Sequence, residues 1–284
     1  MAGRMAIVTG ATSGIGEITA LALAREGWTV GIVCRSREKG EATRARIRSA
    51  TGQDVGLHLA DLGSQREIRG VGDEILARYP RIDLLVNNAG IVNLSRQVSA
   101  DGIEAVFAVN HLGPFLLTNL LLARITASAP ARIVNVASDG HRVVRGIRFE
   151  DPGFAEDWSW WRVYGHSKLA NVLFTTELAR RLEGTGVTVN CVHPGAVATG
   201  LGANNGWIAR LVLPVLRPFF RSPEQGAATS IFVATSPAVE GVTGRYFANC
   251  REVRPSRAAQ DAEAGRRLWE LSARMTGLAV EPAR

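Results

Sequence analysis

Short apolar runs alternate with longer amphipathic stretches along most of the chain. Apolar runs of strand length occur near residues 5–9, 29–34, 54–59, 82–86, 131–137, 186–192 and 244–248. Helix-like stretches lie between them, at about 15–26, 37–49, 64–78, 102–127, 160–184 and 223–235. Because strands alternate with helices, the pattern predicts a single α/β domain, a doubly wound parallel sheet of about seven strands with helices on both faces.

Two connections are longer than the others, and each follows a predicted strand. Residues 139–162 and 196–222 should lie beyond the carboxyl ends of the strands, where doubly wound sheets bind their ligands. Long loops in such positions are usually functional. Within the second loop, the apolar stretch 207–220 is too short to span a bilayer and is interrupted by Arg210, Pro214 and Arg217. It is open whether this stretch forms a substrate lid, lies in a membrane interface or contacts another subunit.

A glycine-rich turn follows the first predicted strand. Gly10, Gly14 and Gly16 stand where strand 5–9 leads into helix 15–26. Glycines let the backbone approach a pyrophosphate, and the helix N-terminus offers free N–H groups and the positive end of a dipole. The turn therefore indicates a dinucleotide site of Rossmann type, although its Gly-x-x-x-Gly-x-Gly spacing differs from the commonest fingerprint.

Tyr164 precedes Lys168 by four residues, which places both on one face of a helix. The lysine is notable because, of the 33 basic residues, only Lys39 and Lys168 are not arginine. A compact ammonium on a flexible stem is something arginine cannot imitate. Placed beneath the phenol, it would favour the ionised form and lower the tyrosine pKa, giving a general acid/base. Chance spacing on an ordinary helix is the alternative for this motif taken alone.

Composition narrows the function classes. The net charge of +7 comes from arginines spread along the chain with acids between them, and no dense basic run with aromatics suggests nucleic-acid binding. The cysteines are Cys34, Cys191 and Cys250, an odd and scattered set typical of reduced thiols in a cytoplasmic protein. No metal-ligand cluster is expected. With the first strand at Met5, we expect no signal peptide or N-terminal anchor and no transmembrane segment.

Taken together, these motifs resemble the short-chain dehydrogenase/reductase family over nearly the whole chain. The shared positions, in the family's order, are Thr9-Gly10-x-x-x-Gly14-Ile15-Gly16, Asn87-Asn88-Ala89-Gly90, Asn110, Ser138, Tyr164-x-x-x-Lys168 and Pro194-Gly195. The stretches YGHSKLANVLFTTELARRLEGTGVTVNCVHPGAVAT and RPFFRSPEQGAATS are similar to the retinol dehydrogenase-like branch, which has many bacterial members. The resemblance implies an oxidoreductase for lipophilic carbonyl and alcohol substrates, favours the lid for 207–220, and does not identify retinol.

The resemblance also implies the roles of four catalytic residues. Tyr164 would exchange a proton with the substrate oxygen, and Ser138 would donate a hydrogen bond to it. Lys168 would lower the phenol pKa and bind the nicotinamide ribose, while Asn110 would hold a water that links Lys168 to solvent. A lone histidine without a placed acid partner is more often structural, so His141 and His193 stay outside the catalytic set.

The dinucleotide is expected to lie mainly on residues 5–135, with residues 136–284 supplying the catalytic residues and the loops 139–162 and 196–222 of the one domain, 1–284. Besides Tyr164 and Lys168, the expected cofactor contacts are Gly10, Thr12, Ser13, Gly14, Ile15, Gly16, Arg35, Asp61, Leu62, Asn88, Ala89, Gly90, Pro194, Gly195, Val197 and Thr199. The end of the second strand predicts NADP(H), because Cys34 replaces the acid of NAD-preferring members and Arg35 can bind a 2′-phosphate. Ser13 stands where similar NADP enzymes sometimes add a basic residue.

The expected substrate pocket consists of His141, Trp158, Trp161 and Trp207. The tryptophans could instead be core, but large apolar groups beside Tyr164 suit a greasy, ring-bearing substrate. Two alternatives remain: a biosynthetic ketoreductase for a polycyclic secondary-metabolite ketone, and a non-catalytic NADP-sensing or scaffold protein. Relatives pair through their two long helices, here 102–127 and 160–184. A homodimer or homotetramer is therefore possible, and segment 139–162 could cover that surface in a monomer.

Overall fold

Strands β1 to β8 form one sheet in the computed structural model, which describes residues 3–195 and 221–279. Their order is β3-β2-β1-β4-β5-β6-β7-β8; all neighbours pair in parallel except β7 and β8. The bounds are β1 Met5–Thr9, β2 Thr29–Cys34, β3 Gly56–Leu59, β4 Leu84–Asn87, β5 Ala131–Val136, β6 Val187–His193, β7 Tyr246–Ala248 and β8 Arg251–Glu252. The doubly wound parallel sheet is confirmed, with one short antiparallel strand more than expected.

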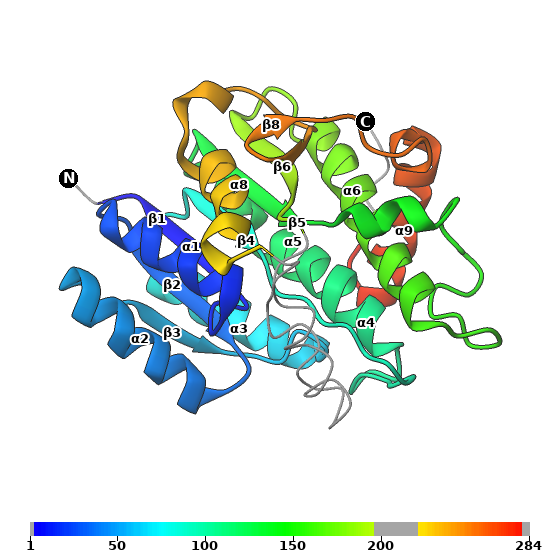
Figure 1. Cartoon of the computed structure of the whole chain (residues 1–284), viewed down its shortest axis with the longest axis horizontal. Helices are drawn as coiled ribbons and strands as arrows, with labels where there is room; N and C mark the ends of the chain where they lie inside the picture. Colours follow the sequence, from blue (N-terminus) through cyan, green and yellow to red (C-terminus); the bar gives the residue numbers. More distant parts are fainter. Residues whose placement is uncertain (1–2, 196–220, 280–284) are drawn as a thin grey trace.

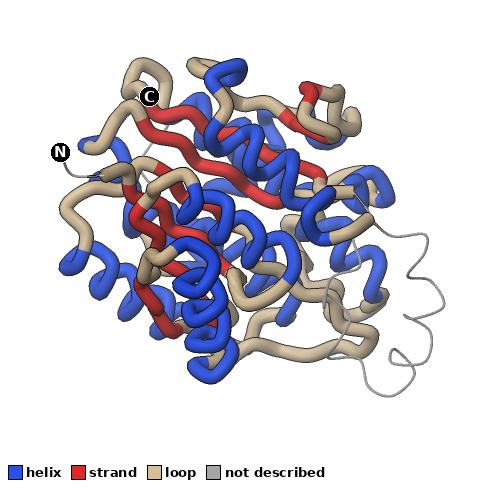
Figure 2. The backbone as a smooth tube through the Cα atoms, turned by 60° about the vertical axis from the view of Figure 1, so that its left-hand side comes forward, coloured by secondary structure: helices blue, strands red, loops and turns tan. Residues whose placement is uncertain are grey.

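Helices cover both faces of this sheet (Figures 1 and 2). Their bounds are α1 Gly14–Arg25, α2 Arg37–Thr51, α3 Gln65–Arg78, α4 Ala105–Phe107, α5 Gly113–Ala127, α6 Trp160–Arg181, α8 Pro223–Thr235 and α9 Ala262–Thr276. α1 packs with α2 and α8, whereas α3 packs with α5, and α6 with α9. Order reverses between β1 and β4, and the crevice at such a switch point is where doubly wound sheets bind ligands.

The alternation of side chains along β1 builds two separate cores. Met5 and Ile7 belong to the apolar cluster beneath α3, α5 and α6, and Ala6 and Val8 belong to the cluster beneath α1 and α8. All four are buried, since successive side chains of a strand point to opposite faces. A strand buried on both sides holds its carboxyl end rigidly, and that end leads into the glycine turn.

Helix α9 was not predicted, and it changes the picture of the subunit surface. It begins at Asp261, whose carboxylate accepts the backbone N–H of Ala264 at 3.0 Å, and ends at Gly277 with a φ of 63°. Trp269 packs edge-on against Phe115 with 5.0 Å between ring centroids. α9 thus covers part of α5 and α6, the surface through which the sequence suggested pairing.

The long helix expected at 102–127 is interrupted. It consists of α4, a π-helical turn η1 at Ala108–Leu112, and α5. Residues Ala105–Ala127 are long and apolar enough to cross a membrane by length and composition, but 78% of their most apolar window is buried inside the protein. Buried core helices have the same composition. The π turn carries Asn110, and such turns are frequent at functional sites.

Candidate active site

The glycine turn is held against the end of β4 by Asn88. Its Nδ2 donates to the carbonyls of Thr9 at 2.9 Å and Gly10 at 3.1 Å. The Thr9 hydroxyl in turn accepts the backbone N–H groups of Asn88 at 3.0 Å and Ala89 at 3.1 Å. The turns after β1 and β4 are therefore one rigid unit, and Asn88 acts within it through the backbone of the turn.

This turn fits a dinucleotide pyrophosphate. A Cβ on Gly16 would lie 2.5 Å from the Gly10 carbonyl oxygen, and one on Gly10 would lie 2.7 Å from Ala89 Cα, so neither position accepts a side chain. Gly10 and Gly14 have positive φ angles of 64° and 56°, which glycine adopts without strain. Ser13 precedes α1 without capping it through its side chain, which leaves the first N–H groups of the helix available to an anion.

The adenosine end of the site would be bounded by residues that follow β2 and β3. Arg35 is exposed directly after β2, and its Nη1 lies 3.9 Å from Asp61 Oδ2. Asp61 Oδ1 accepts the backbone N–H of Gly63 at 2.8 Å, which fixes the carboxylate. Leu62 is buried against Gly113 of α5. The Arg35 guanidinium thus lies after the carboxyl end of β2 beside Asp61, and its part in cofactor binding stays a prediction.

Ser138 and Tyr164 meet beyond the end of β5. Ser138 follows β5 and accepts the N–H of Gly140 at 3.1 Å through Oγ. A Cβ on Gly140 would lie 3.0 Å from Tyr164 Cε1 and 3.5 Å from Ser138 Oγ, so this glycine allows the two side chains to approach. Burial raises the pKa of Tyr164, and a hydrogen bond with Ser138 opposes that rise. The pair can present two hydroxyls to one substrate oxygen.

Lys168 is buried beneath this pair. Its Nζ donates to the Val136 carbonyl at 3.0 Å and lies 5.7 Å from the centroid of the Tyr164 ring. Gly90 borders the same space, because a Cβ there would lie 3.4 Å from Lys168 Nζ and 3.4 Å from Asn110 Oδ1. Burial lowers the Lys168 pKa to about 8. Tyr164, Lys168, Asn110 and Gly90 therefore converge at one place.

The expected depression of the Tyr164 pKa is not found in this structure. Burial raises that pKa, and Ser138 is the only group found to lower it. The physical reason is the position of the ammonium, which is directed to the Val136 carbonyl and lies 5.7 Å from the centroid of the ring. A lysine whose pKa is itself lowered to about 8 also carries less charge near neutral pH than a solvated one.

Asn110 is fully buried, and its side chain is fully occupied. Oδ1 accepts the N–H of Ile91 at 2.7 Å, and Nδ2 donates to the Ile91 carbonyl at 3.0 Å and to Ser167 Oγ at 3.1 Å. These bonds tie the π turn to the segment after β4 and to α6. The side-chain amide therefore positions the residues around Lys168, and the expected water between Asn110 and Lys168 stays a prediction.

The histidines near Ser138 differ from each other. His141 has no exposed surface, and its ring nitrogens contact the Ser138 carbonyl at 2.7 Å and the Ser256 N–H at 3.0 Å. It supports the turn from behind and cannot line the pocket, which corrects that expectation. His193 does have an acid partner, since its Nε2 lies 3.5 Å from Asp139 Oδ2. The pairing joins the end of β6 to Asp139, which follows β5 and lies far away in sequence, so local sequence did not reveal it.

Apolar side chains border Tyr164 on one side. Trp158 and Ile91 are partly buried with it against Val106 and Val163. Trp158 Nε1 donates to Glu104 Oε1 at 3.4 Å, and Glu104 is itself buried. This carboxylate was missed because its partner comes from a different segment. Trp158 therefore packs in the same apolar cluster as Tyr164, and its part in a substrate pocket stays a prediction.

The remaining predicted site residues differ in their exposure, and some lie outside the described residues. Trp161 is 45% exposed at the start of α6. Pro194 is buried after β6, and Gly195 follows it with a φ of 88°. Thr12 and Ser13 are accessible in the turn, whereas Ile15 is buried. Val197, Thr199 and Trp207 lie outside the described residues, as does most of loop 196–222. No group of three metal-ligating side chains occurs within residues 3–195 and 221–279.

The lowered pKa of Lys168 can be measured directly, because the chain has only one other lysine. In protein labelled at lysine 13Cε, one NMR signal should titrate with a midpoint of about 8, since burial disfavours the ammonium. Lys39→Arg removes the other signal and assigns this one. The ammonium would dominate below the midpoint and the neutral amine above it. A Lys168 midpoint near the ordinary value of about 10.4 would contradict the prediction.

Comparison with known proteins shows which family has this sequence and fold. The family model for short chain dehydrogenases matches residues 4–206. Human retinol dehydrogenase 14 is 43% identical, over 98% of this chain and 88% of that protein. An uncharacterized protein from Mycobacterium paratuberculosis has a similar structure, with a TM-score of 0.79 and 33% identity over 97% of this chain and 94% of that one.

A further similar structure is a variant of actinorhodin polyketide ketoreductase solved with NADPH. Its TM-score is 0.68 at 29% identity, covering 87% of this chain and 95% of that one. The two solved structures share the fold described above, and the matched residues 4–206 include the glycine turn. The chain therefore belongs to the short-chain dehydrogenase/reductase family of nicotinamide-dependent oxidoreductases, and within it is retinol dehydrogenase-like.

Proposed function

We propose that this protein is an NADP(H)-dependent oxidoreductase that interconverts a lipophilic carbonyl compound and its alcohol, with Tyr164 as general acid/base. The observation that carries the proposal is the convergence of Tyr164, Ser138 and Lys168 at the carboxyl end of β5, next to the glycine turn. A bound nicotinamide would supply or accept the hydride. The protein contributes orientation, hydrogen bonds and the proton.

In the reducing direction, negative charge grows on the substrate oxygen as its carbon is reduced. Ser138 Oγ would donate a hydrogen bond to that oxygen, and Tyr164 would transfer its proton to it. Because burial raises the pKa of Tyr164, the phenol carries its proton at neutral pH. Lys168, once a cofactor ribose is present, would exchange its bond to the Val136 carbonyl for ribose contacts and restore the phenol proton. Oxidation of an alcohol would reverse these transfers.

The substrate class follows from the side chains beside the phenol. Trp158 and Ile91 offer apolar surface next to Tyr164, and Val143 and Trp161 are exposed on neighbouring segments. Apolar walls with few polar groups suit a greasy substrate. The similarity to retinol dehydrogenase 14 supports such a substrate. The similarity to actinorhodin polyketide ketoreductase favours a polycyclic ketone as second candidate, with the same residues and chemistry.

The proposal is tested by NADPH oxidation with a panel of lipophilic aldehydes, ketones and polycyclic ketones. Turnover of any member supports the reaction class, and the ranking separates the two substrate candidates. Tight NADPH binding without turnover of any panel member would instead favour a cofactor-sensing or scaffold role.

Preference for NADP(H) is expected to depend on Arg35. Its guanidinium lies only 3.9 Å from Asp61, a weak contact that a 2′-phosphate would replace with charged hydrogen bonds. Arg35→Gln should weaken NADPH binding about tenfold or more and change NADH binding little, as measured by fluorescence titration. Arg25→Gln, an exposed arginine at the end of α1, is the charge-matched control. Equal losses for NADPH and NADH in Arg35→Gln would refute the preference.

A cytoplasmic location is part of the proposal. All three cysteines are free, and Cys34 and Cys191 are buried in β2 and β6. Thiols persist in reducing compartments, whereas exported proteins more often form disulfides. The basic residues behind the net charge of +7 are spread along the chain, so nucleic-acid binding is not part of the proposal.

A further inference from the structure

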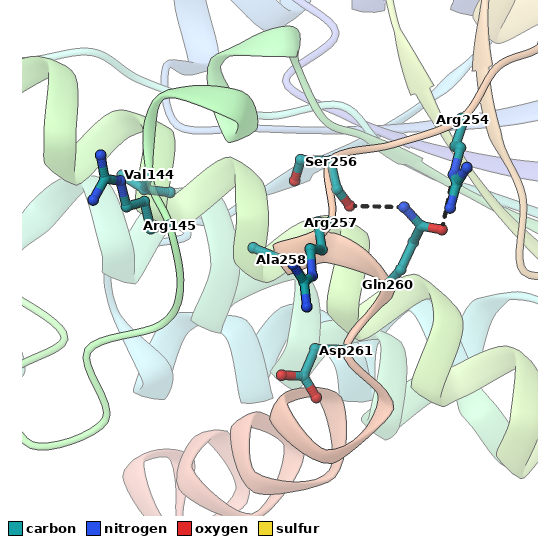
Figure 3. A pocket seen from close by; sticks show the side chains of 8 residues that line it. All are labelled: Val144, Arg145, Arg254, Ser256, Arg257, Ala258, Gln260 and Asp261. Carbon is teal, nitrogen blue, oxygen red and sulfur yellow. Dashed lines mark hydrogen bonds between the residues drawn. The ribbon is translucent and has the colours of Figure 1, made fainter.

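A second pocket lies behind the candidate active site and is lined by arginines. It has a volume of about 640 Å³, within the range of small-molecule sites, and lies between the segment after η2 (Asp139–Val143) and the start of α9. Figure 3 shows Arg145 and Arg254 on opposite sides with Arg257 between them. The remaining lining residues are Val144, Ser256, Ala258, Gln260 and Asp261.

The positive charge of this pocket is not neutralised by the residues around it. Among the described residues, none of Arg145, Arg254 and Arg257 forms an ion pair with an acid. Asp261 is the one acid in the lining, and its carboxylate caps α9 by accepting the N–H of Ala264 at 3.0 Å. Three arginines therefore line the pocket together with one carboxylate that already caps a helix. An excess of cations in a concave site raises the local concentration of anions.

One of the guanidiniums is held in place by a neutral partner. Arg254 Nε donates to Gln260 Oε1 at 3.2 Å, and Gln260 Nε2 donates to the carbonyls of Pro255 and Ser256, each at 3.2 Å (Figure 3). A glutamine fixes the guanidinium without cancelling its charge. The terminal nitrogens of Arg254 stay available, and a planar guanidinium binds carboxylate or phosphate oxygens in pairs.

The pocket is separate from the candidate active site. Its residue Ser256 donates its backbone N–H to His141, which has no exposed surface and in turn contacts the Ser138 carbonyl. The buried histidine thus stands between the two sites. None of the lining residues belongs to the predicted catalytic or cofactor set.

We propose that this pocket binds a small anion carrying two or more negative charges, through Arg145, Arg254 and Arg257. A concave site of this size suits a small molecule better than a flat acidic surface. Three guanidiniums against one occupied carboxylate require more than a single negative charge for balance. Phosphorylated molecules and polycarboxylates share this chemistry, and the test separates them.

The test is isothermal titration calorimetry at low salt with inorganic pyrophosphate, citrate and acetate. Acetate, with one charge, should bind far more weakly than the others. Arg145→Gln/Arg257→Gln should weaken binding about tenfold or more, because charged hydrogen bonds are lost. Gln260→Glu supplies Arg254 with a carboxylate of nearly the same shape and should also weaken binding. If pyrophosphate binds and citrate does not, the pocket is a phosphate site. If pyrophosphate and citrate both bind, it is a general polyanion site.

The matched control separates this pocket from the proposed cofactor site, which also accepts phosphates. Arg35→Gln/Arg37→Gln removes the same charge from the far end of the glycine-turn crevice, where both arginines are exposed. This variant should keep the polyanion affinity of the wild type within about twofold. The proposal is overturned if the control loses binding while Arg145→Gln/Arg257→Gln keeps it, or if neither polyanion binds the wild-type protein. Neither result depends on turnover.

Discussion

Tyr164→Phe is expected to lower kcat by about 10²–10⁴-fold while the variant still folds and binds NADPH, because it removes only the acid that protonates the substrate oxygen. The phenol of Tyr164 meets Ser138 beyond β5. Burial raises the pKa of Tyr164, so its phenol is protonated at neutral pH. The measurement is steady-state NADPH oxidation with the best carbonyl substrate of the wild-type panel.

A matched control for this substitution is available within the chain. Tyr79 contacts His58 Nε2 at 3.0 Å through its hydroxyl, below the edge strand β3, and takes no part in the candidate site. Tyr79→Phe removes the same oxygen and should leave kcat within about twofold. Turnover by Tyr164→Phe at the wild-type rate would eliminate the proposed acid and redirect attention to Ser138 and His193.

Local patterns predicted the parts of this site that depend on a single segment. The glycine turn was recognisable because strand, glycines and helix follow one another directly, and Asn88 pairs with that turn since β1 and β4 are neighbours. Tyr164 and Lys168 lie four residues apart on α6, so helical geometry alone brings them to one face. Parallel strands end at one edge, which explains why Ser138 joins them.

Features that depend on contacts between distant segments were not predictable in the same way. His193 pairs with Asp139, and Trp158 with Glu104, across long separations in sequence. The burial that raises the Tyr164 pKa arises only in the packed structure. Helix α9 is different, because its cap at Asp261 and glycine at 277 are local signals that the strand-based pattern passed over.

The pocket behind His141 depends on α9 as well. Arg254, Arg257 and Gln260 lie between β8 and α9, and Arg145 reaches them from the segment after η2. In sequence, these three arginines are among many charges spread along the chain with acids between them, so they indicated no site. Only the fold shows that their charges lie on one pocket and that the acid among them caps a helix.

Lys168→Arg is expected to lower turnover by about 10²-fold or more, although it keeps the positive charge. Lys168 is 3% exposed, and its single ammonium fits between the Tyr164 ring and the Val136 carbonyl. A guanidinium is planar and larger, so it would overpack this space or displace Tyr164. The readouts are kcat with saturating NADPH and the affinity for NADPH, and both should fall, because Lys168 is proposed to contact the ribose as well as restore the phenol proton.

The same substitution at the other lysine of the chain provides the control. Lys39 is exposed in the first turn of α2, and Lys39→Arg exchanges one solvated cation for another. With saturating cofactor its kcat should stay within about twofold of the wild type. If Lys168→Arg and Lys39→Arg were equally active, a buried positive charge would be all that the site needs. The preference of this arginine-rich chain for lysine at 168 would then have no catalytic meaning. A loss confined to Lys168→Arg, with the fold intact by circular dichroism, shows that the compact ammonium itself is required.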